Sequence, residues 1–115
     1  MERTDKKSVG LTAETQAILA EIEQKNWFLE GQDIARFALA YAIRLGVADG
    51  VTNGVDTRWA VGNFDESGEL RTLLGALYPT CETPVRLMEH LVNEGLQLLI
   101  GRIRSKAIGP AELMS

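Results

Sequence analysis

One stretch of this sequence, residues 33–45, is apolar on nearly every side of the helix that its spacing predicts. Its main apolar face comprises Ile34, Phe37, Ala38, Tyr41, Ala42 and Leu45. Leu39 and Ile43 project from the opposite side, and only a stripe containing Arg36 and Arg44 interrupts the apolar surface. A helix of this kind must be covered on more than one side. We therefore expect it in the centre of a fold or at an interface between subunits.

Helical spacing and end signals predict four helices in all. The first is capped by Thr12 and ends near Lys25, the second is residues 33–45, the third is capped by Asp65 or Ser67 and ended by Tyr78-Pro79, and the fourth begins at Thr83-Pro84. Two further segments have strand character: residues 8–11, where apolar and small residues alternate, and residues 55–61, which lie between turn formers. They could pair with each other, within one subunit or between two.

These elements predict a mainly α protein: a four-helix single domain with one or two short strands. We expect a flexible N-terminal arm over residues 1–7, the helical domain over residues 8–105 and a flexible tail over residues 106–115. The length of 115 residues suits one domain that buries roughly two-thirds of its unfolded surface.

Three local features carry packing expectations. A leucine stripe should be the buried side of the third helix: Leu70, Leu73, Leu74 and Leu77. The aromatic cluster at residues 27–29 should plug the open end of the first two helices. Gly95 and Gly101, inside the fourth helix, predict a bend or a close approach of another helix.

Charge and composition exclude several classes of protein. The formal net charge is −4, so a basic field over the whole molecule is absent and any DNA contact must come from a local patch. An anionic membrane surface is disfavoured for the same reason, and no apolar run reaches the ~18 residues of a membrane span. The charged N-terminus is unlike a signal peptide, and a single cysteine is typical of a cytoplasmic protein.

The residues needed for catalysis are sparse. His90 and Cys81 are the only histidine and the only cysteine, which excludes a conventional tetrahedral zinc site. Neither residue has a partner in the sequence that would make it a general base or an activated nucleophile. No phosphate-binding glycine loop or dinucleotide fingerprint is present. We expect no enzymatic activity, no metal and no cofactor.

Two basic features remain as candidate contacts for nucleic acid. One is the N-terminal arm, with Lys6 and Lys7, and the other is the stripe of Arg36 and Arg44. These side chains could simply be solvated or paired with carboxylates, since the chain has excess acid. Alternatively they contact phosphates, and self-association would then align several copies of a small patch.

The order of a short strand, a helix with one apolar stripe and a more apolar second helix resembles a ribbon-helix-helix unit. In that class the strand pairs across a dimer and its polar face enters the major groove. The matching outward positions are Thr4, Lys6 and Ser8.

Over residues 8–105 the chain resembles the small DndE-type proteins of the bacterial DNA sulfur-modification (phosphorothioation) system. The resemblance is carried by the two early helices, the tryptophan-containing segment Asp56-Thr57-Arg58-Trp59-Ala60-Val61-Gly62, the leucine-rich helix, and His90-Leu91-Val92-Asn93-Glu94-Gly95. It implies an oligomeric, non-catalytic, DNA-associated accessory protein.

These observations lead to one hypothesis and one alternative. The hypothesis is a homo-oligomeric accessory protein that contacts DNA through the four basic residues and joins other proteins of a modification complex. Its candidate subunit interface comprises Val9, Leu11, Leu39 and Ile43. The alternative is a protein–protein adaptor or scaffold subunit with no nucleic-acid contact.

Overall fold

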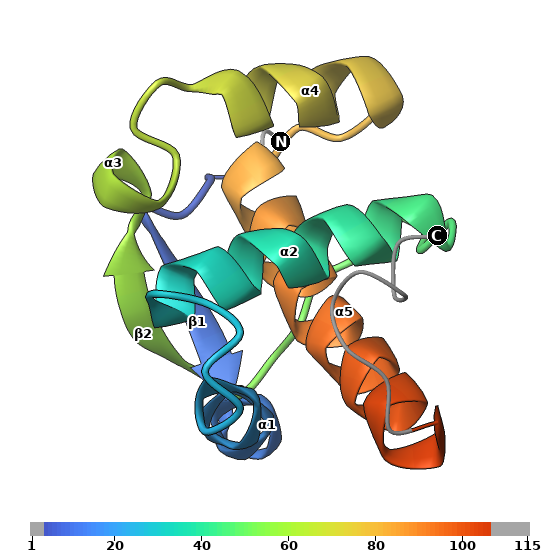
Figure 1. Ribbon diagram of the computed structural model, residues 1–115. Helices are drawn as coiled ribbons and strands as arrows, with labels where there is room; N and C mark the ends of the chain where they lie inside the picture. Colours follow the sequence, from blue (N-terminus) through green and yellow to red (C-terminus); the bar gives the residue numbers. More distant parts are fainter. Residues whose placement is uncertain (1–3, 107–115) are drawn as a thin grey trace.

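The computed structural model describes residues 4–106, which form a mainly α-helical domain with one small sheet (Figure 1). The elements in chain order are β1 (Ser8–Thr12), α1 (Ala13–Glu23), α2 (Gly31–Arg44), β2 (Val55–Ala60), α3 (Val61–Phe64), α4 (Glu69–Leu77) and α5 (Pro84–Lys106). The predicted mainly α class with short strands is confirmed. The one-turn helix α3 was not predicted, because four residues are too few to produce a helical periodicity.

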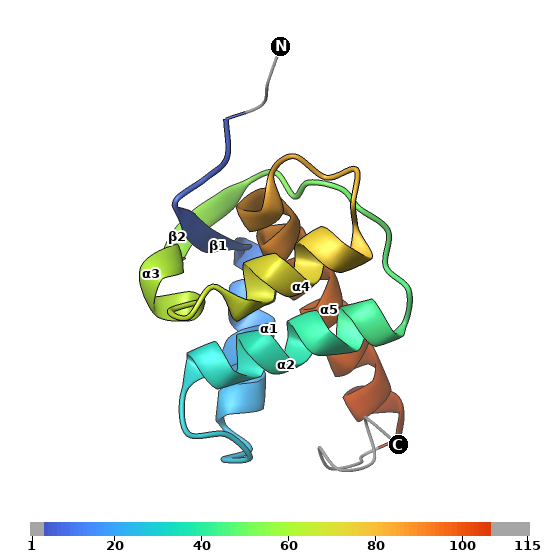
Figure 2. The same ribbon diagram turned by 90° about the horizontal axis from the view of Figure 1, so that it is seen from above.

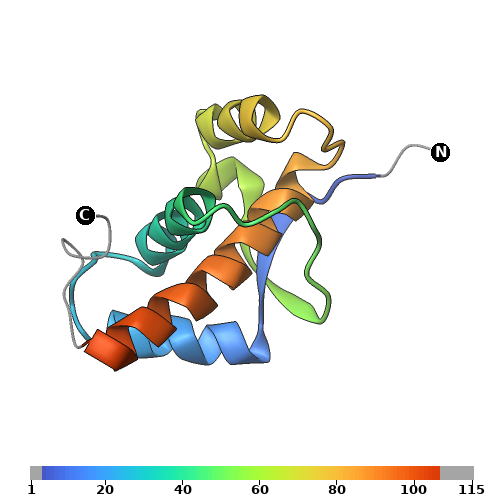
Figure 3. The ribbon, with the colours of Figure 1, turned by 90° about the vertical axis from the view of Figure 1, so that its right-hand side faces the viewer.

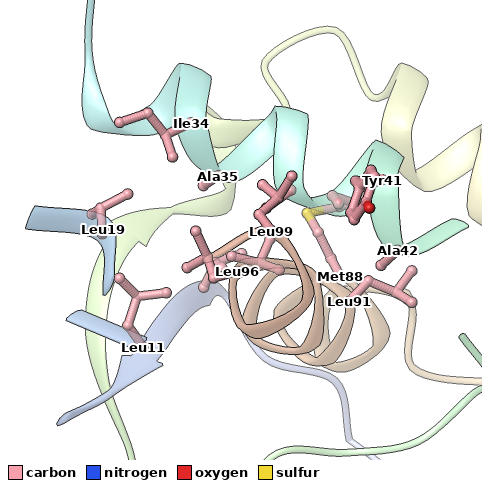
Figure 4. Packing of buried hydrophobic residues seen from close by; sticks show 14 of the residues in the cluster. Leu11, Leu19, Ile34, Ala35, Tyr41, Ala42, Met88, Leu91, Leu96 and Leu99 are labelled. Atoms are coloured by element: carbon pink, nitrogen blue, oxygen red, sulfur yellow. The ribbon is translucent and has the colours of Figure 1, made fainter. Parts of the chain in front are cut away.

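Helices α2 and α5 cross at the centre of the molecule (Figures 1 and 4). The face of α2 at the crossing carries small residues, Ala35, Ala38 and Ala42, and all three are fully buried. On α5 the crossing falls at Gly95, where an added methyl carbon would lie 2.0 Å from the carbonyl oxygen of Ala38. The close helix approach predicted at this glycine is therefore confirmed, and the second cover that α2 requires comes from its own chain.

Strands β1 and β2 pair with each other, which is one of the possibilities that the sequence left open, and they do so antiparallel and within one chain. The ladder joins Val9 to Trp59 and Gly10 to Thr57, so Arg58 is the extra residue of a β-bulge. α1 follows β1 directly. Its N-cap is Thr12, whose side chain accepts a hydrogen bond from the N–H of Thr15. α1 runs beside α5 and ends near that helix's C-terminal half (Figure 3), where Arg104 pairs with Glu21 at 2.8 Å.

The aromatic connection after α1 differs in part from the expectation. Trp27 and Phe28 are half-buried against the core, and the Phe28 ring meets Phe37 edge-on at 5.3 Å. Leu29 is 98 % exposed, so the predicted plug consists of the two aromatic residues alone. The helix itself ends at Glu23, and Asn26 takes a left-handed conformation with φ 59°.

The leucine stripe of α4 is buried only in part. Leu74 is fully buried, but Leu73 and Leu77 are 45 % and 48 % exposed. The prediction of a wholly buried stripe is wrong because α4 lies at the periphery, above α2 and the start of α5 (Figure 1). α2 and α4 run side by side in the same direction (Figure 2). The chain therefore covers one side of α4 and leaves the other open.

The start of α5 is bound by the N-terminal segment of the chain. Asp5 accepts hydrogen bonds from the backbone N–H groups of Val85 and Arg86, at 2.9 and 3.1 Å. The Arg86 side chain in turn donates to the carbonyl oxygen of Thr4. Of the predicted flexible arm, residues 4–7 are thus held against α5, while residues 1–3 and the tail from residue 107 lie outside the described residues. None of the helices within residues 4–106 has the length and apolar character needed to cross a membrane.

Candidate functional site

Lys6, one of the four candidate DNA contacts, is engaged inside the chain. Its ammonium group forms an ion pair with the carboxylate of Glu89 on α5. The Glu89 side chain is only 3 % exposed, whereas that of Lys6 is 21 % exposed. Because removing one partner leaves a buried charge uncompensated, this pair is expensive to break. The charge of Lys6 therefore neutralises a buried carboxylate within the fold.

Glu89 and Asn93 seal the edge of β1 that faces away from β2. Glu89 accepts the N–H of Gly10 at 2.8 Å. Asn93 donates to the carbonyl oxygen of Gly10 at 3.0 Å and accepts the N–H of Thr12 at 3.1 Å. An edge strand normally presents such groups to solvent or to another strand. Here two side chains of α5 take the place of a neighbouring strand.

The outer edge of β2 is open by contrast. The polar groups of Gly10 point to α5, so Gly10 and Thr57 form a non-hydrogen-bonded pair of the ladder. The N–H and C=O of Thr57 must then point away from β1. Within residues 4–106 no group hydrogen-bonds to that side of β2. Asp56, Thr57 and Arg58 are all exposed there.

Three basic residues from different parts of the chain lie at or near α3. Lys7 is exposed, and its backbone oxygen accepts the N–H of Val61 at the start of α3. Arg36 of α2 donates through Nε to the carbonyl oxygen of Phe64 at the end of α3, at 3.0 Å. Arg58 is exposed two residues before the end of β2 and lies over the Trp59 ring at 5.5 Å. Sequence reasoning missed Arg58, because only the pairing of β1 with β2 brings it near Lys7.

The side chain of Arg36 makes several contacts within the chain. Its guanidinium also donates to Asp33 at 3.2 Å and to Gln32 at 2.8 Å, and it lies 5.3 Å from the centre of the Phe64 ring. It borders an open cleft of about 640 Å³ between α2 and α4. The other lining residues are Asn63, Phe64, Asp65, Glu66, Ser67, Glu69 and Leu70. The carboxylates on the opposite wall would disfavour a phosphate deep in this cleft.

Arg44 is exposed near the C-terminal end of α2 and makes no ion pair within residues 4–106. Eight residues of helix separate it from Arg36, which corresponds to about 12 Å along the axis. The structure therefore places Lys7 and Arg36 at the two ends of α3 and Arg44 away from both. The charge of Lys6 is paired with Glu89 inside the fold.

The residues expected at a subunit interface are mostly interior residues. Val9, Leu11 and Leu39 are almost completely buried within a single chain, and Ile43 is half-buried. An interface through the first three would require the chain to open, because α5 already covers β1 and α2. Other apolar residues face outward, among them Leu45 at the C-cap of α2 and Leu73 and Leu77 of α4.

A buried carboxylate organises the turn between α3 and α4. Asp65 accepts the backbone N–H groups of Leu70 and Arg71 and the Nε–H of the Arg71 side chain at 2.8 Å. Burial by itself raises the pKa of Asp65, but the hydrogen bonds from Arg71 and from the two backbone groups outweigh it. The net result is a pKa below the ordinary value. Asp65 stays ionised at neutral pH and accepts two N–H groups of the first turn of α4, although the N-cap position itself is Gly68 and not Asp65 or Ser67 as expected.

His90 and Cys81 both lie beside the loop of residues 49–52. The Nδ1 atom of His90 and the hydroxyl group of Thr52 form a hydrogen bond of 2.9 Å. Cys81 is half-buried and borders a hollow of about 280 Å³ lined mainly by loop residues. Across residues 4–106, no three His, Cys, Asp or Glu side chains come together as metal ligands.

The chain matches no protein-family model, no curated protein and no solved structure.

Proposed function

We propose that this protein is a non-catalytic, self-associating accessory protein that contacts the DNA backbone, in the manner of a component of a DNA sulfur-modification system. The observation that carries the proposal is the gathering of Lys7, Arg36 and Arg58 around α3. Lys7 and Arg36 contact the two ends of α3 and Arg58 precedes it by three residues, so three cations lie close to one short helix despite the net charge of −4. Arginine side chains that are already ordered lose little freedom on binding a phosphate.

The proposed contact differs from that of a ribbon-helix-helix protein. In that class β1 would pair with β1 of a second subunit and present Thr4, Lys6 and Ser8 to the major groove. Glu89 and Asn93 occupy the edge of β1 that such pairing needs. We therefore propose backbone contact by the patch around α3, with Lys7 outermost, and no insertion of a β1 ribbon.

The test is binding to a short DNA duplex, followed by fluorescence anisotropy between about 50 and 200 mM salt, the range over which phosphate contacts weaken most visibly. The variant Lys7→Glu should weaken binding about tenfold at the lowest salt and flatten the salt dependence. Lys25→Glu is the matched control, because this exposed lysine lies beyond the end of α1 and its reversal changes the net charge by the same amount. Absence of wild-type binding at low salt, or equal losses in Lys7→Glu and the control, would refute DNA contact.

A second candidate function is a protein–protein adaptor without nucleic-acid contact. The exposed side of α4, with Leu73 and Leu77 about half exposed, favours it. Single exposed leucines are ordinary on protein surfaces, but two on one helical face, four residues apart, make a small apolar stripe. Two results together would support the adaptor. The wild-type protein would fail to bind DNA, and the double variant Leu73→Glu with Leu77→Glu would no longer assemble with the partner protein.

A further inference from the structure

We infer that two copies of this chain associate by antiparallel pairing of their β2 strands through the open edge at Thr57. The inference rests on the self-association in the proposed function and not on DNA contact. The pairing assigns self-association to one surface of the molecule. Neither the interface residues expected from the sequence nor the packing of the core identifies that surface.

The backbone of β2 offers the required groups. Gly10 directs its N–H and C=O to Glu89 and Asn93, which turns the N–H and C=O of Thr57 outward. An antiparallel pair centred on Thr57 would let the two threonines exchange both hydrogen bonds across a two-fold axis. The opposite edge of the sheet cannot do this, because α5 side chains occupy it.

The side chains of β2 are complementary to a second copy of themselves. Residues 56–58 read acidic, threonine and basic, so the order of charges is reversed in an antiparallel second copy: Asp56, Thr57 and Arg58. Pairing about Thr57 places Asp56 opposite Arg58 of the partner subunit, twice by symmetry. Opposite charges are a favourable cross-strand combination.

The surroundings of β2 favour a second copy over an unrelated strand. Asp56 has no ion pair within residues 4–106, and Arg58 lies only over the ring of Trp59. The bulge at Arg58 increases the local twist and so disfavours pairing with a regular flat strand. A second copy has the same bulge and therefore a matching twist.

The experiment is sedimentation velocity of the whole chain over a concentration series, with charge-exchange variants at the two exposed positions. Asp56→Arg and Arg58→Asp should each weaken dimerisation about tenfold or more, since each creates two like-charge pairs. The double exchange Asp56→Arg with Arg58→Asp should restore it. An equimolar mixture of the two single variants should form a heterodimer, because each then supplies the charge the other lacks.

Thr57→Pro is a second variant that acts on the backbone instead of the charges. Proline removes an N–H that points away from β1, so the chain should keep its fold by circular dichroism and lose dimerisation. Lys25→Glu should leave dimerisation unchanged.

The outcomes separate the hypotheses. Unaltered dimerisation in both single variants, or a double exchange no better than either single variant, overturns β2 pairing. If the double variant Leu73→Glu with Leu77→Glu is then monomeric, the wild-type protein self-associates through α4 instead. A wild-type protein that is still monomeric at about 100 μM overturns both forms of self-association, because any association would then be weaker than roughly 5.5 kcal/mol. DNA contact is judged separately by the salt series.

Discussion

At the scale of single residues, Gly95 fixes how closely the two central helices approach. A methyl group there would come within 2.0 Å of the Ala38 carbonyl oxygen, and that oxygen belongs to the backbone of α2. The neighbour cannot move aside without moving the helix. Gly101, six residues along the same helix, has open space at the corresponding position.

These two glycines give a matched pair of variants. Gly95→Ala should lower the free energy of unfolding by about 3 kcal/mol, the upper part of the range for overpacking, because α2 must shift. Gly101→Ala should raise it by roughly 0.5–1 kcal/mol, since alanine is the better helix former where nothing obstructs its methyl group. Urea unfolding of both variants checks the pair, and equal changes in the two would contradict the crossing at Gly95.

At the scale of elements, α4 depends on a cap that lies outside it. Asp65 receives two backbone N–H groups of the first turn and the Arg71 side chain, and its pKa is lowered. A carboxyl with a lower pKa in the folded state stabilises the fold at pH values above its unfolded pKa of about 3.9. That stabilisation is lost as the pH falls through the folded pKa.

The variant Asp65→Asn should therefore be less stable than the wild type by about 1–2 kcal/mol at pH 7, the range for a lost cap and charge-assisted hydrogen bonds. The difference should shrink as the pH falls below the unfolded pKa of about 3.9 and through the lower folded pKa, because the wild-type carboxyl takes up a proton first in the unfolded state and then in the folded state. Urea unfolding at pH 7, 5 and 3 measures it. A gap that stays constant down to pH 3 would show that the charge of Asp65 does not stabilise α4.

The sequence predicted most elements because their signals are local. Thr12 as a cap, Pro84 at a helix start and the apolar spacing of residues 33–45 are all short-range features, and the structure has each of them. Pairing of the two strand segments was one of the possibilities, within one subunit or between two, and the structure has it within one chain. Burial of the α4 stripe was mistaken because amphipathic spacing does not tell how much of a face the rest of the chain will cover.

The candidate site was harder to predict because it depends on contacts distant in the sequence. Lys6 meets Glu89 across 83 residues, and no local pattern marks that pair. The one available signal was the position of Glu89 and Asn93, four residues apart on an otherwise apolar face of α5. Polar residues in such places must find partners when buried. Their partner, the edge of β1, follows only from the fold.

At the scale of the whole molecule, the crossed helices α2 and α5 form the interior, while the small sheet lies at one side with unequal edges (Figures 1 and 3). Covering an edge is a common way to prevent unwanted strand pairing. This chain covers β1 with buried side chains of α5 and leaves β2 uncovered with self-complementary residues. The asymmetry links the interior of the fold to its assembly.

Amide hydrogen exchange by NMR over a concentration series tests this link most directly. The N–H groups of Gly10 and Thr12 should be protected at every concentration, because Glu89 and Asn93 accept them within one chain. The N–H of Thr57 should exchange freely in dilute solution and become protected in step with dimerisation. A Thr57 amide that still exchanges freely when the protein is fully dimeric would contradict assembly through β2.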